Sequence, residues 1–409
     1  MPATRLEQAL RAELTKLSRT GTLKGREAVI CEVLPPTHGH GPRYRLAGEG
    51  GRRFLRMSSN GYLGLALAPE VIAAEERASR AFGAGPGAVR FISGTHQAHI
   101  ELEARLAAFH RRPAAMVFSS AYATVMGVLS SLITAETAVI SDALNHNSII
   151  NAIRLARPRE RHVYPHLDLA ALEACLAEAA NACRRAIVVT DGVFSMRGDV
   201  APLAEIMALA AGFDAEFPEN VLVAVDDSHG VGAFGASGRG SEEATGSPPA
   251  DILIGTLGKA FGVNGGYVAA ADTIIEYLRQ TAPFYIYSNP ITPGEAAAAL
   301  AALAIVDGPR GRAMLEHLRA MTGRLRDGLA RLGYASVPGT HPIVPLVVGD
   351  PGRTEALVRH LRDSDILATA INYPVVPHGE EEIRFQVSAD HTAADIDQVL
   401  AALARAPGG

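Results

Sequence analysis

The feature of this sequence that most limits its fold is a set of six short apolar runs between residues 114 and 271, separated by helix-like stretches. Most of these runs are continuously apolar rather than alternating. Strands buried on both faces of a mainly parallel sheet have this pattern, and the helices between them would cover both faces. The sequence therefore predicts an α/β fold whose strands include AAMVFSS, TAVISD, RAIVVTDG, ENVLVAVDD, ADILIGT and GGYVAAA.

Three parts of the chain are expected. Residues 1–60 read as an amphipathic helix, a Pro/Gly-rich link and an exposed strand pair in GPRYRLAGEGGRRFLR, which together would form an arm or lid. Residues 61–290 would form the large domain around the sheet. After the helix breaker NPITP, an alanine-rich helix leads into the strand-like runs HPIVPLVVG, ILATAINYP and EIRFQVS, so residues 291–409 would form a smaller α+β domain.

Charge and composition argue against several classes of function. The 409 residues carry a formal net charge of -5, with no basic excess that would attract nucleic acid or an anionic membrane. No apolar run reaches membrane-spanning length. The three cysteines lack metal-ligand spacing, and His38 and His40 in THGH lack a third ligand. We therefore expect reduced thiols, no metal site and a cytoplasmic protein.

Small or polar residues follow most of the predicted strands. In open α/β sheets, ligands bind beyond the carboxyl ends of the strands, so these residues are candidates to converge on one site. They are Ser119, Ser120, Asp142, Asp191, Asp226, Thr256 and Lys259.

Lys259 lies in GTLGKAFG, a glycine-containing loop after a predicted buried strand. A lysine in this position can be a surface charge, a phosphate ligand or a nucleophile that forms a Schiff base. The segment lacks the spacing and the Ser/Thr of a phosphate-binding P-loop. Taken alone, it leaves the surface charge and the nucleophile about equally plausible.

Two other segments favour a cofactor site. The strand in VLVAVDDSHGVGAFG ends at Asp226, and a buried carboxylate needs a partner, which a pyridinium nitrogen could supply. His229 could bind the same cofactor or support the aspartate, although a lone histidine in a turn is usually structural. SSAYATVMGVL places a helix start after a strand, which suits phosphate binding but is also an ordinary N-cap.

Together these segments resemble the α-oxoamine synthase family of fold type I pyridoxal-phosphate (PLP) enzymes. The resemblance covers nearly the whole chain. It implies an aminotransferase-like large domain with a mainly parallel seven-stranded sheet and a smaller C-terminal domain. The matching segments, in the family's order, include SSNGYLGLA, GAGPGAVRFISGTHQAHIELEARLA, SDALNHNSII, TDGVFSM, VDDSHGVGAFGASGRG, GTLGKAFG and EIRFQVSADHT.

The resemblance also implies roles for individual residues. Lys259 would form the Schiff base with PLP and then carry the α-proton, Asp226 would pair with the pyridine nitrogen, and His146 would stack on the ring. The resemblance further implies that His229 and Ser195 lie near the phenolic oxygen of PLP. The amides of Ala121 and Tyr122 and the hydroxyl of Thr256 would bind its phosphate, and Ser288 would bind the phosphate of a neighbouring subunit. Asn60 and Arg384 would bind the amino-acid carboxylate.

The implied activity is a PLP-dependent acyl transfer in which an amino acid condenses with an acyl-CoA and CoA is released, in a homodimer with shared active sites. The segments are most similar to glycine C-acetyltransferases, which implies glycine and acetyl-CoA. Other family members, such as 8-amino-7-oxononanoate synthases (alanine plus pimeloyl-CoA) and 5-aminolevulinate synthases, remain alternatives. A specialised enzyme with another donor or an aldol-type reaction, and a non-catalytic partner subunit, also remain alternatives.

Four positions depart from the family pattern. Arg197 in FSMRGD stands where an acidic residue is usual, Ala121 and Val125 stand where Gly and Asn are common, and Pro86 interrupts a glycine-rich stretch. Arg197 is either a surface change or, near the acyl-CoA entrance, a change of acyl donor.

Overall fold

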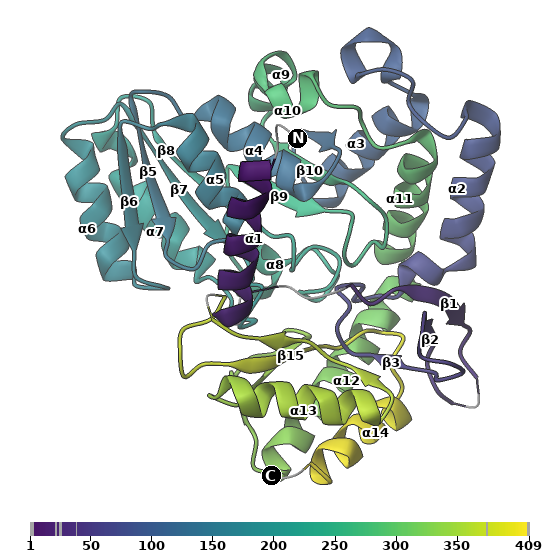
Figure 1. Cartoon of the computed structure of the whole chain (residues 1–409). Coiled ribbons are helices and arrows are strands. Elements are labelled where there is room, and N and C mark those ends of the chain that lie inside the picture. Colours follow the sequence, from purple (N-terminus) through teal and green to yellow (C-terminus); the bar gives the residue numbers. More distant parts are fainter. Residues whose placement is uncertain (1–3, 21–22, 24–26, 38, 374, 407–409) are drawn as a thin grey trace.

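The computed structural model describes residues 4–20, 23, 27–37, 39–373 and 375–406. Its centre is a sheet of seven strands in the order β4-β10-β9-β8-β7-β5-β6. Strands β9, β8, β7, β5 and β6 run parallel, whereas β10 is antiparallel to both of its neighbours. This is the predicted mainly parallel α/β sheet (Figure 1). The strands are β4 (Ala114–Phe118), β5 (Thr137–Asp142), β6 (Glu160–Tyr164), β7 (Arg185–Asp191), β8 (Val221–Asp226), β9 (Ile252–Thr256) and β10 (Gly266–Ala270).

The six apolar runs all form strands of this sheet, and β6 is the one strand that they did not include. Its sequence, ERHVY, alternates in exposure because it is an edge strand that pairs only with β5. The inner strands are apolar on both sides because both faces are covered. Val139 packs into the cluster on one face, whereas its neighbours Ala138 and Ile140 pack into the cluster on the other.

Helices cover both faces of the sheet. One face carries α4 (Ala121–Leu132), α5 (Asn147–Ala156), α9 (Asp272–Thr281) and α10 (Pro283–Ile286). On the other face, α6 (Leu169–Ala180) and α7 (Leu203–Phe213) cover the parallel strands, and α2 (Pro69–Phe82), α3 (Gln97–Phe109) and α11 (Pro293–Val306) pack beside β4 and β10. Short helices complete this part: η1 (Leu65–Leu67), η2 (Arg90–Gly94), η3 (Asp214–Glu216) and α8 (Ser241–Thr245).

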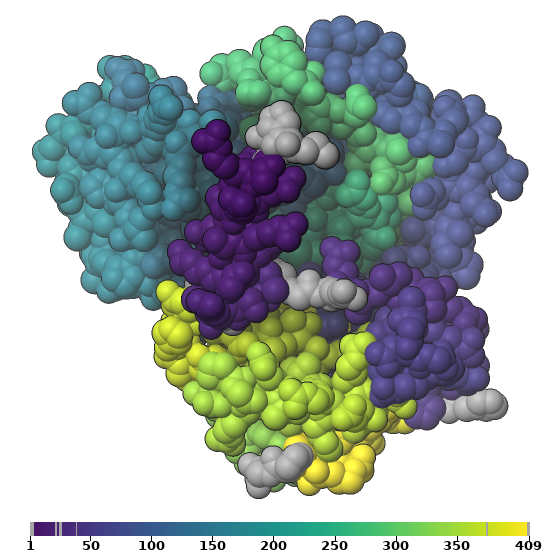
Figure 2. All heavy atoms as spheres, in the orientation of Figure 1, coloured from purple at the N-terminus to yellow at the C-terminus, as the bar shows by residue number. Residues whose placement is uncertain are grey.

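The C-terminal part lies below the large sheet in Figures 1 and 2. It contains an antiparallel sheet of order β11-β12-β15-β14. Its elements are α12 (Pro309–Arg331), β11 (Ala335–Ser336), β12 (Ile343–Val347), α13 (Pro351–Asp363), β13 (Ile366–Leu367), β14 (Ala370–Ile371), β15 (Glu382–Gln386) and α14 (Ala393–Ala404). The domain division at residues 60 and 290 stays a proposal.

The N-terminal segment does not pair as predicted. Strand β2 (Arg43–Leu46) pairs with β1 (Ile30–Leu34), and only a Tyr44–Phe54 bridge joins it to the second half of the expected strand pair. Strand β3 (Leu55–Arg56) instead pairs in parallel with β13 of the C-terminal part. The reason is burial, because Phe54 and Leu55 are almost completely enclosed.

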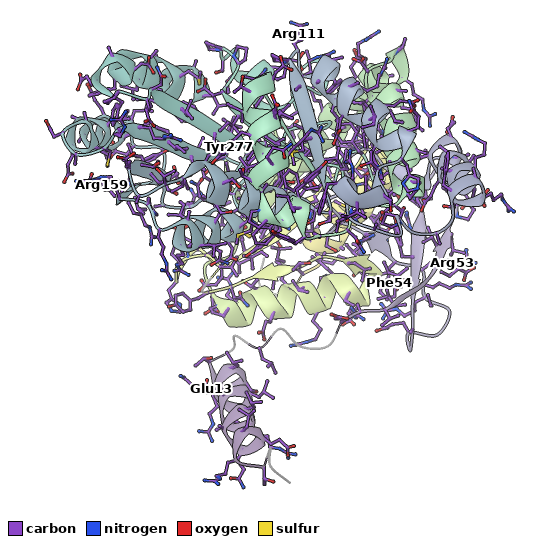
Figure 3. All side chains as sticks on the ribbon, turned by 90° about the horizontal axis from the view of Figure 1, so that it is seen from above. Glu13, Arg53, Phe54, Arg111, Arg159 and Tyr277 are labelled. Carbon is purple, nitrogen blue, oxygen red and sulfur yellow. The ribbon has the colours of Figure 1, made fainter. Side chains whose placement is uncertain are left out.

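The first helix, α1 (Thr4–Arg19), has no buried residue. Figure 3 shows it, with Glu13 labelled, standing clear of the rest of the chain. No helix in the part of the chain that the structure describes is long and apolar enough to cross a membrane. The three cysteines are free. His40 Nδ1 lies 3.1 Å from Asp395 Oδ1, whereas His38 lies outside the described residues.

Candidate active site

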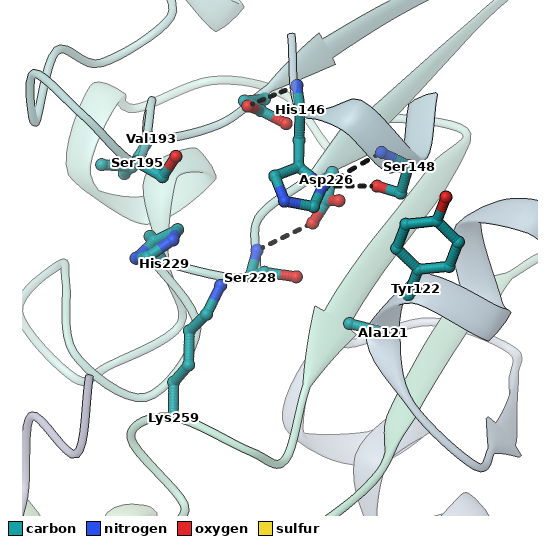
Figure 4. A pocket seen from close by; sticks show the side chains of 11 residues that line it. Ala121, Tyr122, His146, Ser148, Val193, Ser195, Asp226, Ser228, His229 and Lys259 are labelled. Carbon is teal, nitrogen blue, oxygen red and sulfur yellow. Dashed lines mark hydrogen bonds between the residues drawn. The ribbon is translucent and has the colours of Figure 1, made fainter. Parts of the chain in front are cut away.

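A cavity lies beyond the carboxyl ends of β7, β8 and β9, where the sequence places the candidate residues (Figure 4). It has an empty volume of about 350 Å³, part of which is open to solvent. Seven of the eleven predicted site residues line it. The full lining is Ala121, Tyr122, His146, Ser148, Asp191, Val193, Ser195, Asp226, Ser228, His229 and Lys259.

Lys259 extends into this cavity from the loop between β9 and β10. The loop is held by backbone hydrogen bonds, including one from Gly262 N to Lys259 O at 3.1 Å. Gly262 has φ 72°, and a side chain there would meet the backbone nitrogen of Ala66 at 2.4 Å. Burial lowers the pKa of Lys259 to about 8, although Asp226 and Asp191 act in the opposite direction. The loop thus holds an amine that loses its proton near neutral pH.

Asp226 and Asp191 end neighbouring parallel strands and are paired in register. Asp226 Oδ1 accepts a hydrogen bond from Ser228 N at 3.1 Å, and Asp191 Oδ2 accepts one from His146 N at 3.2 Å. Burial and the negative charge of Asp226 raise the pKa of Asp191 well above its ordinary value. The Asp191 carboxyl group therefore keeps its proton to a higher pH than an exposed aspartate does.

His146 lies at the start of α5, on the wall of the cavity opposite Lys259. Its Nδ1 accepts a hydrogen bond from Ser148 N at 3.2 Å and lies 2.7 Å from Ser148 Oγ. Partial burial lowers the pKa of His146, Lys259 adds to this effect, and Asp226 opposes it. Because Nδ1 accepts, the proton of the neutral imidazole lies on Nε2.

His229 is held by a residue that the sequence analysis did not select. The hydroxyl of Tyr62 lies 2.7 Å from His229 Nδ1, and His341 Nε2 lies 2.9 Å from His229 O. Burial lowers the pKa of His229 well below its ordinary value, and Lys259 adds to the effect. Tyr62 belongs to the segment SSNGYLGLA, but nothing in that segment indicates that it meets a histidine 167 positions later.

The first turn of α4 supplies Ala121 and Tyr122 to the cavity. Ser120 is the N-cap, and its Oγ accepts a hydrogen bond from Ala123 N at 3.1 Å. The first amides of a helix have no intrahelical partner and attract anions. The N-cap reading of this segment is therefore confirmed, and the phosphate role of the Ala121 and Tyr122 amides stays a prediction.

Two predicted phosphate ligands lie away from the cavity wall. Thr256 Oγ1 donates to Gly265 O at 3.2 Å and accepts from Gly258 N at 3.1 Å, within the lysine loop. Ser288 follows α10, and its Oγ donates to Asn289 O at 3.4 Å. Their roles toward phosphate stay predictions, and for Ser288 the predicted phosphate is that of a neighbouring subunit.

The predicted carboxylate ligands lie on the C-terminal side of the cavity. Arg384 Nη1 donates to the carbonyl of Ser195 at 2.6 Å, and Ser195 lines the cavity. Asn60 Oδ1 accepts from Gln386 Nε2 at 2.5 Å. The sequence analysis did not select Gln386, although its spacing from Arg384 puts both on one face of β15.

The residues present fit PLP. Ser228 Oγ lines the cavity, is buried and has no hydrogen-bond partner among the described residues, as expected where a polar ligand binds. The cavity also combines an amine of lowered pKa, a carboxylate and the amides of a helix start. These groups match the aldehyde, pyridine nitrogen and phosphate of PLP.

Comparisons with known proteins give a consistent result. The family Aminotransferase class I and II matches residues 52–403. The chain is 45% identical over 368 residues to 8-amino-7-oxononanoate synthase of Marinobacter nauticus, and this alignment covers 89% of this chain and 90% of that protein. It is 38% identical over 399 residues to mitochondrial 2-amino-3-ketobutyrate coenzyme A ligase of Bos taurus, covering 97% and 91%. Among solved structures, serine palmitoyltransferase from S. paucimobilis with bound PLP–myriocin aldimine has a TM-score of 0.87 and 28% identity, covering 97% and 96%.

Proposed function

The chain belongs to the α-oxoamine synthase family, whose cofactor is PLP, and on that premise we propose that it condenses an amino acid with an acyl-CoA and releases CoA. The observation that carries this proposal is the position of Lys259. Its amine, with a pKa near 8, shares one cavity with Asp226, His146 and the first turn of α4.

In this proposal, Lys259 holds the cofactor aldehyde, Asp226 faces the pyridine nitrogen, and the amides of Ala121 and Tyr122 bind the phosphate. Bound PLP supplies an electron sink for a carbanion at the amino acid's Cα. Lys259 Nζ takes the α-proton, and a pKa near the working pH suits an amine for this transfer. The Cα–acyl bond then forms, the thioester C–S bond breaks, and CoA leaves as the thiolate.

Glycine and acetyl-CoA are the first proposed pair, because the motifs most resemble glycine C-acetyltransferases. Alanine and pimeloyl-CoA are the second, because the 45% identical relative is an 8-amino-7-oxononanoate synthase.

The contacts of Arg197 help to choose between the two acyl donors. Its guanidinium already contacts Asp199 Oδ2 and Glu380 Oε2, each at 2.9 Å. These two contacts offset the charge of Arg197 and so weaken its attraction for the free carboxylate of a pimeloyl group, which supports the uncharged acyl donor.

The test measures CoA release by the PLP-loaded protein with each amino acid and acyl-CoA pair. We expect glycine-dependent release from acetyl-CoA, and at least about a 10³-fold loss for Lys259→Ala, within the range that acid–base catalysis contributes. Lys16→Ala, which changes an exposed lysine of α1, is the matched control. Failure of every pair to release CoA would overturn the proposal.

We also propose a homodimer with shared active sites. Exposed apolar side chains near Ser288 support this. Tyr287 is 81% exposed beside Ser288, and Phe91 and Ile92 on η2, which contacts α10, are more than 60% exposed. Exposed apolar side chains that gather in one region of a surface can mark an interface.

A further inference from the structure

Strand β15 has one polar and one apolar face. Ile383 and Phe385 are fully buried in the core of the C-terminal part. Glu382, Arg384 and Gln386 alternate with them and therefore point to the opposite side. The latter two residues contact other parts of the chain there: Arg384 donates to Ser195 O of the large domain, and Gln386 donates to Asn60 Oδ1 of the N-terminal part. Neither Glu382 nor Gln386 has a role in the proposed function, and Glu382 is the ionisable one of the two.

Glu382 is a buried carboxyl group with an unpaired oxygen. It is 2% exposed, and its Oε1 has no hydrogen-bond partner among the described residues. Burial raises its pKa to about 8, against the pull of Arg384 and Arg197, while Glu380 and Asp199 add to the rise. The residues paired with Glu382 in the sheet, Val347 of β12 and Ile371 of β14, are apolar. The main charges that act on Glu382 are therefore the four groups just named.

Arg384 is a partly buried cation on the same face of β15. One of its nitrogens, Nη1, donates to Ser195 O, whereas Nε is buried and has no partner in the described part of the chain. Burial lowers the pKa of Arg384, and Tyr62 and Glu382 oppose this. A buried guanidinium is costly unless a carboxylate pairs with it, and the free Nε side can accept one. Substrate and Glu382 can both supply that negative charge.

We propose that Glu382 is a positioning residue that acts through Arg384, and that its charge sets how tightly the amino acid's carboxylate is held. This rests on the proposed function, since it assumes that Arg384 binds that carboxylate. While Glu382 is protonated, the full positive charge of Arg384 is available to the substrate. Once Glu382 ionises, its negative charge offsets part of the positive charge of Arg384 and repels the incoming carboxylate.

The consequence is a pH-dependent affinity. Glu382 is neutral below a pH of about 8 and ionised above it, so the dissociation constant of the amino acid rises as the pH passes through about 8. The rise is about tenfold, the order expected when one charge is added close to a partly buried ion. The turnover number kcat changes much less, because Glu382 does not touch the reacting atoms.

The experiment titrates the PLP-loaded full-length protein with glycine and alanine from pH 6.5 to 9.5, following the cofactor absorbance without acyl-CoA. KM and kcat are measured in parallel. In Glu382→Gln we expect the dissociation constant to stay near the low-pH value of the unaltered protein across the range. Ionisation of Lys259 and of the free amino acid affects both proteins equally, so the comparison isolates Glu382.

The same pH dependence in the unaltered protein and in Glu382→Gln would overturn the inference alone. Absence of any amino-acid response would overturn the proposed function and the inference together.

Two further variants keep the test decisive. Glu380→Gln removes an equal charge two residues away, but Glu380 is exposed and pairs with Arg197, so the pH step should remain. Arg197→Gln removes a cation that favours ionised Glu382, so the step should move to higher pH. A step that disappears in Glu380→Gln, or that stays in place in Arg197→Gln, would contradict the proposal even if Glu382→Gln does not fold.

Discussion

Two adjacent aspartates at the end of β8 occupy opposite environments. Asp226 faces the cavity, whereas Asp227 points into a glycine-lined space where its Oδ2 accepts a hydrogen bond from Ser241 N at 2.8 Å. Added Cβ atoms at Gly230 and Gly240 would lie only 2.1 and 1.8 Å from its oxygens. Consecutive residues at a strand end point to opposite sides, so one aspartate is available for chemistry and the other for structure.

The structural aspartate gives a pH prediction. Burial raises the pKa of Asp227 to about 8, above that of the unfolded chain, so the folded state binds this proton more tightly. Stability from this residue is therefore present at low pH and is lost as the pH rises from about 4 to about 8. We expect the Tm of the natural protein to fall relative to that of Asp227→Asn between pH 5 and 9, as measured by calorimetry.

The control for this prediction is Asp397→Asn. Asp397 is exposed, and its hydrogen bond to Arg324 lowers its pKa, so its pH effect lies in the acid range. Parallel curves of Tm against pH for the natural protein and Asp227→Asn would show that Asp227 carries no such proton.

At the scale of elements, the phosphate end of the site depends on contact between β10 and α4. Gly266, the first residue of β10, lies opposite Thr256 of β9. A Cβ at Gly266 would lie 2.4 Å from the backbone nitrogen of Ala121, the first residue of α4. The strand can therefore approach the helix only with glycine at this position, and the approach fixes the direction of the first amides of α4.

Gly266→Ala should weaken PLP binding. The added methyl group must push the start of α4 away, and overpacking of this kind costs roughly 1–3 kcal/mol. If the shift falls on the phosphate site, PLP affinity drops by about ten- to a hundredfold, as measured by equilibrium titration of the apoprotein. Gly212→Ala on α7 has open space around the new Cβ and should leave affinity unchanged. Equal affinities of the two variants would exclude this contact as a determinant.

At the scale of the whole molecule, the large-sheet part lines the cavity, and the C-terminal part contacts one of its lining residues. The large sheet supplies Lys259 and Asp226, and the C-terminal part places Arg384 against Ser195 O. The N-terminal segment fastens to the C-terminal part, since β3 pairs with β13 and Arg43 Nη2 donates to Asp395 Oδ1 at 2.6 Å. Movement between these parts would change the distance between Arg384 and Lys259.

The proposed dimer gives a prediction at the same scale. Tyr287→Asp puts a charge into the exposed apolar surface beside η2, so we expect dissociation to monomers by analytical ultracentrifugation, together with loss of PLP and activity. Val163→Asp makes the same kind of change on the edge strand β6 and should leave the dimer intact. Ser288→Ala should keep the dimer but lower PLP affinity about tenfold, the order of one lost hydrogen bond to a charged group. A Tyr287→Asp protein that remains dimeric would contradict this interface.

The sequence alone determined six of the seven strands of the large sheet, because strands covered on both faces need uninterrupted apolar residues, and Val139 with its neighbours shows that pattern. It also determined which strand ends carry Lys259 and Asp226. It did not separate Asp142, another strand-end candidate, from the site. In the structure Asp142 Oδ1 lies 3.0 Å from His166 Nδ1, away from the cavity.

Only the tertiary structure decided which distant side chains meet. Tyr62 reaches His229, and Gln386 reaches Asn60. Apolar periodicity reports which face of an element is buried, and that information is local. The partner of a buried polar group depends on how separate elements pack, and this packing brings together residues more than 160 positions apart.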